Sequence, residues 1–208
     1  MNLSEPAEPM MPFATARVLR VLSGSTRGFT MREIARLAGM PHTTVGGVVG
    51  RLAETGLVLT TRVGRAELCS LNRNHLATEA MLALVNLRTT INEAIKKEIL
   101  SWPTQPLHAS IFGSAARKDG SRRSDIDILV IRPGDASDDD WQSQLFNSGQ
   151  TIYQMTGNHV SWFDISRDDL DAAQRANEPI VQSWKTDGVH LAGGPLTSLL
   201  ANTALAQS

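Results

Sequence analysis

Two aspartates, Asp125 and Asp127, carry the clearest chemical signal in this sequence. They stand at i and i+2 in the run SDIDILV, which reads as a strand, so both carboxylates point to one face. Adjacent carboxylates repel each other when both are ionised, and a cation removes that repulsion. Mg²⁺ prefers carboxylate oxygens and often carries substrate phosphates in its remaining positions. The pair therefore predicts a metal site that handles phosphates.

A Gly-Ser turn lies upstream of the pair. Gly113-Ser114 follows a short apolar strand, and ten residues separate it from Asp125. Glycine permits close backbone approach, and the start of the following helix offers free N–H groups to an anion. We expect the turn to hold phosphates and Arg117, one helical turn after Ser114, to pair with one of them. A solvated basic loop is expected at Lys118, Arg122 and Arg123.

The whole segment, IFGSAARKDGSRRSDIDILVI, resembles the nucleotidyltransferase superfamily related to DNA polymerase beta, and in particular its minimal, MNT-type bacterial members. The resemblance covers about residues 105–194. It implies that Asp125 and Asp127 bind Mg²⁺, with Mn²⁺ as the alternative ion. It also implies that an NTP substrate is bound through Gly113, Ser114, Arg117 and Ser124.

Active members of that family carry a third carboxylate on a neighbouring strand, and here the matching strand is HVSWFDI. The family pattern places this group near Ser161, which is not acidic. Asp164 is the candidate, although strand alternation points it to the opposite face unless a bulge intervenes. His159 is an alternative base. Without a third group the domain would bind nucleotide and not transfer it.

The N-terminal part has helical apolar periodicity over 13–23, then a capping-box pattern at Thr30 and Glu33, and a third helix after Pro41. Two extended runs follow, joined by a turn at Val63-Gly64. Three helices and a hairpin predict a winged helix-turn-helix. The sequence TMREIARLAGMPHTTVGGVVGRLAETGLV resembles bacterial regulators of the MarR type.

In such domains the third helix and the wing contact DNA. The candidate contacts are His42, Thr43, Thr44, Gly47, Arg51, Arg62 and Arg65. Gly46, Gly47 and Gly50 leave few side chains to read bases, and each glycine costs a helix about 1 kcal/mol relative to alanine. A weak DNA-binding domain or a protein-interaction module is therefore the alternative.

The predicted fold class is α/β (α+β), a winged helix-turn-helix followed by a nucleotidyltransferase fold with a mixed sheet. We expect a disordered lead-in at 1–12, the winged helix at 13–72, a linker helix at 73–104, the transferase domain at 105–194 and a C-terminal tail at 195–208. The linker helix carries an apolar stripe, which either packs on its own domains or forms a homodimer. Its residues are Leu84, Leu87, Ile91, Ile95 and Ile99.

The composition is that of an ordinary soluble protein, with 208 residues, 41% hydrophobic and 20% charged. No apolar run approaches a membrane span, and the N-terminus does not read as a signal peptide. The one cysteine, Cys69, excludes an internal disulfide and is expected to be half-buried on a strand. These features predict a cytoplasmic protein. Eight arginines against five glutamates give residues 1–72 a charge of +3, and the rest of the chain is acidic, which suggests different partners for the two parts.

Together these features predict Mg²⁺-dependent transfer of a nucleoside monophosphate to a hydroxyl of a protein or RNA acceptor, coupled to DNA binding. A macromolecular acceptor is favoured because the chain lacks the large C-terminal helical domain that often forms an acceptor site. The alternatives are a transcription regulator with an inactive, nucleotide-sensing transferase-like domain, and an antitoxin-like interaction protein.

Overall fold

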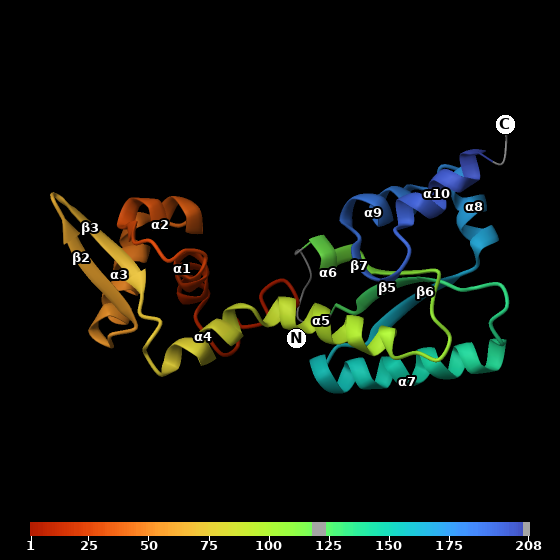
Figure 1. Cartoon of the computed structure of the whole chain (residues 1–208), viewed down its shortest axis with the longest axis horizontal. Helices are drawn as coiled ribbons and strands as arrows, with labels where there is room; N and C mark the ends of the chain where they lie inside the picture. The colour runs from red at the N-terminus through yellow and green to blue at the C-terminus, as the bar shows by residue number, and fades with distance from the viewer. Residues whose placement is uncertain (118–123, 206–208) are drawn as a thin grey trace. The chain divides into compact units, whose positions relative to one another are not determined.

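The structure, a computed structural model, describes residues 1–117 and 124–205 (Figure 1). The chain divides into two compact units. The first is Glu5–Arg88, and the second is Thr89–Ser208 together with Met1–Ser4. Helices with a small antiparallel sheet make up the first unit, and a mixed sheet with helices makes up the second, which confirms the predicted fold class. Within residues 1–117 and 124–205, every helix is too short or too polar to span a bilayer.

The first unit consists of helices around a three-stranded antiparallel sheet of order β1-β3-β2. Its elements are α1 (Phe13–Ser23), β1 (Phe29–Thr30), α2 (Met31–Ala38), α3 (His42–Glu54), β2 (Val58–Val63), β3 (Ala66–Leu71) and α4 (Ala77–Val85). The predicted helix over 13–23, the third helix and the hairpin are therefore confirmed. The short strand β1, which pairs with β3 at Cys69 and Leu68, was not predicted.

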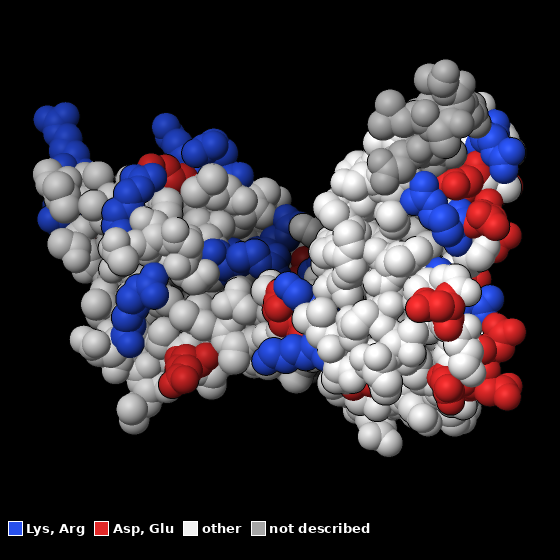
Figure 2. Space-filling model, turned by 45° about the vertical axis from the view of Figure 1, so that its right-hand side comes forward, with Lys and Arg blue, Asp and Glu red and all other residues white. Residues whose placement is uncertain are grey.

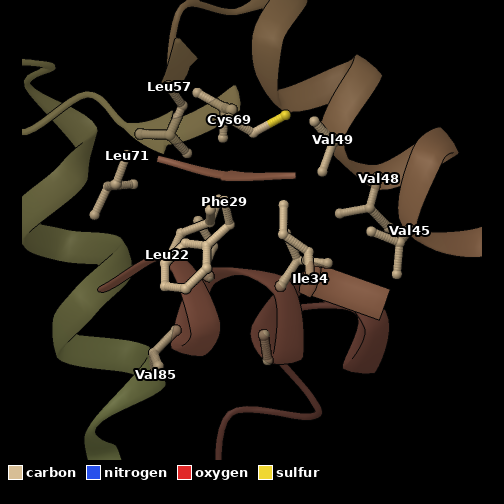
Figure 3. Packing of buried hydrophobic residues seen from close by; sticks show 14 of the residues in the cluster. Leu22, Phe29, Ile34, Val45, Val48, Val49, Leu57, Cys69, Leu71 and Val85 are labelled. Carbon is tan, nitrogen blue, oxygen red and sulfur yellow. The ribbon is translucent and has the colours of Figure 1, made fainter. Parts of the chain in front are cut away.

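A single apolar core holds this unit together (Figure 3). The face of α3 that carries Val45, Val48 and Val49 is buried in it, as the 3.6-residue period requires. Cys69 is fully buried there rather than half-buried, and burial raises the pKa of its thiol. The predicted capping box starts α2, because Thr30 Oγ1 accepts from Glu33 N and Thr30 N donates to Glu33 Oε2.

The second unit is built on a four-stranded sheet of order β6-β5-β4-β7. Strands β5 and β6 are parallel, and β4 is antiparallel to both β5 and β7. The elements are α5 (Leu87–Leu100), β4 (His108–Ile111), α6 (Gly113–Arg117), β5 (Ile126–Ile131), α7 (Asp138–Thr156), β6 (Val160–Ile165), α8 (Arg167–Arg175), α9 (Pro179–Asp187), β7 (Val189–Gly193) and α10 (Leu196–Leu205).

The two faces of this sheet are covered by different helices (Figure 1). On one face Leu129, Ile131 and Phe163 pack with apolar side chains of α8, α9 and α10. On the other face Trp162 packs edge-on against Trp102, which also contacts Trp141 of α7. The side chains of Asp127 and Leu129 share the first face, because alternate strand residues point the same way.

Three boundary predictions are corrected by long-range packing. Residues 1–12 form hydrogen-bonded turns, and Leu3, Ala7 and Met11 among them are buried, so the segment is not a disordered lead-in. The linker is two helices that meet at Asn86, the C-cap of α4. The described part of the C-terminal tail is α10, whose Leu196 and Leu200 join the core of the second unit.

The apolar stripe of the linker is used within the chain. Ile91, Ile95 and Ile99 are all buried, and Leu84 packs against the core of the first unit. This outcome matches the alternative in which the stripe packs on its own domains. Leu84 and Leu87 are only partly buried, and the homodimer stays a prediction.

Candidate active site and DNA-binding surface

The turn at Gly113 and the carboxylate of Asp127 touch each other. Gly113 has φ +66°, and a Cβ built on it would lie 3.2 Å from Asp127 Cγ and closer still to Oδ2. Phe112 N donates to the main-chain oxygen of Asp127 at 3.0 Å, which fixes the two segments side by side. A side chain at 113 would occupy the space that the carboxylate fills, so glycine is required here both for its backbone conformation and for this contact.

Asp125 and Asp127 lie close enough to interact. Burial raises the pKa of Asp127, the charge of Asp125 raises it further, and the charge of Arg117 lowers it. Asp127 is half-buried and Asp125 is exposed, so the pair faces an accessible edge. A divalent cation would relieve the repulsion that the pKa of Asp127 reflects.

The donor set fits a magnesium ion that shares its coordination with a substrate. Within residues 1–117 and 124–205 there is no cluster of three or more His, Cys, Asp or Glu side chains able to hold a metal. Two carboxylates alone are the usual protein contribution to a Mg²⁺ that retains waters and substrate phosphates. Of the described residues, Asp125 and Asp127 would thus supply two carboxylates and leave the other coordination positions to water and substrate.

Arg117 is held beside the pair by the last residue of α9. Its Nη1 donates to Asp187 Oδ2 at 3.4 Å, and Ser183 Oγ donates to the same oxygen at 3.2 Å. Arg117 itself ends α6, one helical turn after Ser114. The sequence did not identify Asp187 as the partner of Arg117, because two residues 70 positions apart give no local signal.

Asn158 is a second residue that the sequence did not single out. It is 4% exposed, and its Nδ2 donates to the main-chain oxygens of Ser124 and Met1, at 2.9 Å each. Ser124 immediately precedes Asp125, so this buried amide fixes the chain at the start of the carboxylate pair. Asn158 follows the helix-ending Gly157, and a sequence alone would assign it to an exposed turn.

The neighbouring strand does not supply a third carboxylate at the expected place. In the parallel register of β5 and β6, Asp127 lies opposite Ser161 and Val130 lies opposite Asp164. Asp164 therefore belongs to the other face of the sheet, where it accepts hydrogen bonds from Trp141 Nε1 (2.9 Å) and Gln142 Nε2 (3.1 Å). The pairing is continuous from Ile126 to Ile131, without the bulge that the prediction required. We therefore remove Asp164 from the candidate site.

The main chain of His159, which immediately precedes β6, lies beside the start of β5. Its main-chain oxygen accepts from Ile126 N at 2.8 Å, between the two aspartates in sequence. Its ring stacks on Tyr153 with centroids 4.6 Å apart. The predicted basic loop at Lys118, Arg122 and Arg123 lies outside the described residues.

All seven predicted DNA contacts lie on the surface of the first unit. Each is exposed: His42, Thr43, Thr44, Gly47 and Arg51 on α3, and Arg62 and Arg65 at the wing turn. Basic side chains predominate on the visible face of this unit (Figure 2). A Cβ added at Gly46 or Gly50 would meet nothing within 4 Å. Packing therefore does not require these two glycines.

Both halves of the chain match known families. Residues 11–66 match the model of the MarR family, and residues 93–181 match the model of the nucleotidyltransferase domain. The chain therefore carries a MarR-family winged helix-turn-helix domain followed by a nucleotidyltransferase domain. No curated protein matches the chain.

Similar solved structures are distant. One is a toxin–antitoxin structure with AMP-PNP, 20% identical with a TM-score of 0.39, covering 56% of this chain and 86% of that one. Another is a tri-AMPylated Shewanella oneidensis HEPN toxin in complex with an MNT antitoxin, 16% identical with a TM-score of 0.36, covering 57% and 85%. A probable transcriptional regulator from Pseudomonas aeruginosa is 26% identical with a TM-score of 0.33, covering 41% and 65%. What those names say of ligands and partners concerns those proteins alone.

Proposed function

We propose that the second unit transfers a nucleoside monophosphate from an NTP to a hydroxyl of a protein or RNA acceptor, and that the winged helix brings it to DNA. The observation that carries this proposal is the contact between the Gly113 turn and the Asp127 carboxylate. It brings a phosphate-binding turn and a carboxylate pair into one site. A solvated pair of aspartates on a strand edge would have no need of that contact.

Each residue of the site would have a separate role in binding the nucleotide. Asp125 and Asp127 would hold Mg²⁺, which when bound neutralises phosphate charge. Main-chain N–H groups at Gly113 and Ser114, with the Ser114 hydroxyl, would hold the phosphates. Arg117, oriented by Asp187, would pair with a phosphate oxygen. Ser124 would contribute through its fixed main chain, which sets the position of Asp125.

In the proposed reaction the acceptor hydroxyl oxygen forms a bond to the α-phosphorus of the NTP. The bond from that phosphorus to the oxygen bridging to the β-phosphate breaks, and pyrophosphate leaves with the bonding electrons. The hydroxyl proton passes to a base. Because the non-acidic Ser161 stands opposite Asp127, the proposed base is His159, the other candidate, whose main-chain oxygen accepts from Ile126 N.

The test is incubation of the full chain with each α-³²P-labelled NTP, Mg²⁺ and host lysate, beside the Asp125→Ala/Asp127→Ala double variant. Label that enters protein or RNA with the wild type and not with the variant would support the transferase and identify its acceptor class. Nucleotide binding without transfer, in Mg²⁺ and in Mn²⁺, would contradict it. Asp168→Ala, an exposed aspartate on α8, is the matched control for removing a carboxylate.

A second candidate function is a transcription regulator whose transferase-like domain senses nucleotide. Ser161 at the position opposite Asp127 favours it, because active relatives would need an acid there. This function predicts that an NTP with Mg²⁺ changes the affinity of the full chain for DNA, and that no label is transferred. The labelling experiment and a mobility-shift titration with and without NTP together distinguish the two functions.

DNA binding itself is proposed through α3 and the wing. Arg62 and Arg65 are exposed at the hairpin turn, where they would contact phosphates, and Arg51 would do so from α3. Removing one arginine–phosphate interaction should reduce the slope of log affinity against log salt by about 1. Arg62→Gln should therefore flatten the salt dependence, whereas Arg175→Gln, on α8 of the second unit, should leave it unchanged.

A further inference from the structure

Strand β6 forms one edge of the sheet in the second unit, and no further strand in the described part of the chain pairs with it. The main-chain oxygens of His159 and Ile165 both accept hydrogen bonds from the β5 side. Main-chain groups of alternate residues turn to the same side of a strand, so the odd-numbered residues from 159 to 165 bond to β5. The N–H and C=O groups of the even-numbered residues therefore point out of the sheet. These outward residues are Val160, Trp162 and Asp164.

The sequence of β6 lacks the features that usually protect a sheet edge. Prolines, lysines and bulges prevent edge strands from pairing with another chain. The strand VSWFDI contains no proline, lysine or arginine, and its pairing with β5 is continuous. Its one charged side chain, Asp164, is held towards α7 by Trp141 and Gln142. Every residue of the strand is partly exposed, so this edge is accessible to a partner.

Helix α7 presents a row of uncharged residues along the same edge. Residues spaced three and four apart share one face of a helix. The row consists of Gln142, Phe146, Gly149 and Tyr153. Gln142 Nε2 donates to Asp164 Oδ2 at 3.1 Å, near the end of β6. The Tyr153 ring stacks on His159, which immediately precedes β6. The row therefore follows the whole edge, and Phe146 lies along it between these two contacts.

The two aromatic side chains of the row are largely uncovered. Phe146 is 67% exposed and Tyr153 is 42% exposed. If a whole aromatic side chain has about 200 Å² of surface, the two expose roughly 200 Å² together. Exposed aromatic side chains are enriched where proteins bind one another. Exposed aromatics beside an open strand edge indicate a partner that covers both the helix and the strand.

We propose that β6 and α7 pair with the same two elements of a second copy of this chain, about a two-fold axis. The two β6 strands then run antiparallel and continue the sheet. In such a pair the outward residues bond to one another, and residues directly opposite have side chains on the same face. The axis therefore passes through Trp162, which faces its own counterpart, while Val160 faces Asp164 of the second copy.

The same axis brings the two α7 helices together. It keeps both helices on one face of the continued sheet, where they lie antiparallel. A Cβ on Gly149 would lie 3.4 Å from Trp162 Nε1, so the helices meet near Gly149, where the missing side chain permits close approach. Phe146 lies three residues before this point and Tyr153 four residues after it. Phe146 of each copy therefore contacts Tyr153 of the other.

A second copy fits this surface better than an extended peptide does. A peptide would satisfy the strand edge but leave both aromatic side chains exposed. Four aromatics supply roughly 400 Å² of the minimum of about 1,000 Å² that a specific interface buries, and the two strands and the rest of the row supply the remainder. Antiparallel pairing also keeps the acidic starts of the two helices apart, each near the uncharged last turn of the other helix. The pairing does not depend on nucleotide transfer.

Sedimentation equilibrium of the full chain at tens of micromolar tests the pairing. We expect the wild type to associate and Phe146→Glu to halve its average mass, with the mass of one chain, 22.6 kDa, as the lower limit. Phe146→Glu should weaken association at least about tenfold. Leu100→Glu, at a side chain of α5 that is 51% exposed, is the matched control and should change nothing. Phe146→Glu/Tyr153→Arg should regain at least about tenfold, because each new glutamate then meets an arginine of the other copy.

Hydrogen exchange of the main-chain amides tests the strand pairing without a substitution. The outward amides of β6 should exchange at least about tenfold more slowly in the associated chain than after dilution, and rapidly in Phe146→Glu. The amides of Ser161 and Phe163, which bond to β5, should stay protected throughout. A monomeric wild type overturns the proposal and leaves the edge to a different partner. Association that persists in Phe146→Glu, a folded double variant without recovery, or outward amides that exchange rapidly in the associated chain also overturn it.

Discussion

Replacing Gly113 with alanine separates the requirements of the fold from those of the candidate active site. Gly113 has φ +66°, and an alanine in the left-handed region costs about 1–2 kcal/mol. Its Cβ would also fall 3.2 Å from Asp127 Cγ and closer still to Oδ2. The Asp127 main chain is tied into β5 and to Phe112 N, so the carboxylate has to turn away.

Gly157→Ala provides the matched control. Gly157 has φ +72°, and a Cβ there would meet nothing within 4 Å, so this substitution introduces the backbone strain alone. Both variants should lower the free energy of unfolding of the second unit by about 1–2 kcal/mol. Gly113→Ala should in addition weaken Mg²⁺-dependent nucleotide binding at least about tenfold, the range for a disturbed metal ligand.

Tryptophan fluorescence in urea measures the first quantity. All four tryptophans, Trp102, Trp141, Trp162 and Trp184, belong to the second unit, so the signal reports that unit alone. Calorimetric titration with a non-hydrolysable NTP and Mg²⁺ measures the second. If Gly113→Ala binds nucleotide as tightly as Gly157→Ala does, the contact between the turn and the carboxylate has no part in binding, and the reasoning is refuted.

Three further predictions concern other parts of the chain. Folding raises the pKa of Asp127, so the folded chain disfavours the ionised carboxylate. The free energy of unfolding therefore declines as the pH rises from the ordinary carboxyl pKa to the raised pKa of the folded chain. Asp127→Asn should therefore stabilise the metal-free chain at pH 7. The gain in the free energy of unfolding, measured by urea titration, should shrink as the pH falls to the ordinary carboxyl pKa of about 4. A gain that does not change with pH would contradict this. Ser148→Ala should cost about 1–3 kcal/mol by tryptophan fluorescence, because Ser148 Oγ accepts from the buried Trp102 Nε1 at 2.6 Å; Ser143→Ala, on the same helix, is the control. Gly50→Ala should stabilise the first unit by up to about 1 kcal/mol in circular dichroism melts, since nothing lies near the added Cβ; an unchanged or lower stability would show a packing role.

Local patterns predicted most of the elements. The capping box that starts α2 is formed, as the spacing of Thr30 and Glu33 indicated. The helical spacing of the apolar residues correctly indicated that Val45, Val48 and Val49 lie in the core of the first unit. These features succeed because each depends on residues three or four apart, whose geometry a helix fixes.

The errors share one cause, which is that the deciding contact lies far away in sequence. Leu196 and Leu200 read as a tail, yet they pack with α8 and the sheet. Asp164 read as a candidate acid, yet Trp141 and Gln142 of α7 hold it on the other face. A strand register fixes the face of every side chain at once, and no local pattern specifies the register of β6 against β5.

Two properties of the candidate site disfavour folding in the absence of a ligand. The left-handed Gly113 loses more conformational freedom on folding than any other residue type would, and Asp127 is half-buried beside a like charge. A fold has no need of either property, since an apolar residue at 127 would join Leu129 and Ile131 without repulsion. Such a combination is expected where a cation and phosphates are bound, because binding recovers what folding loses. Two independent features of the site thus support binding. Transfer depends in addition on a base, and the residue that the register places opposite Asp127 is Ser161, which is not an acid.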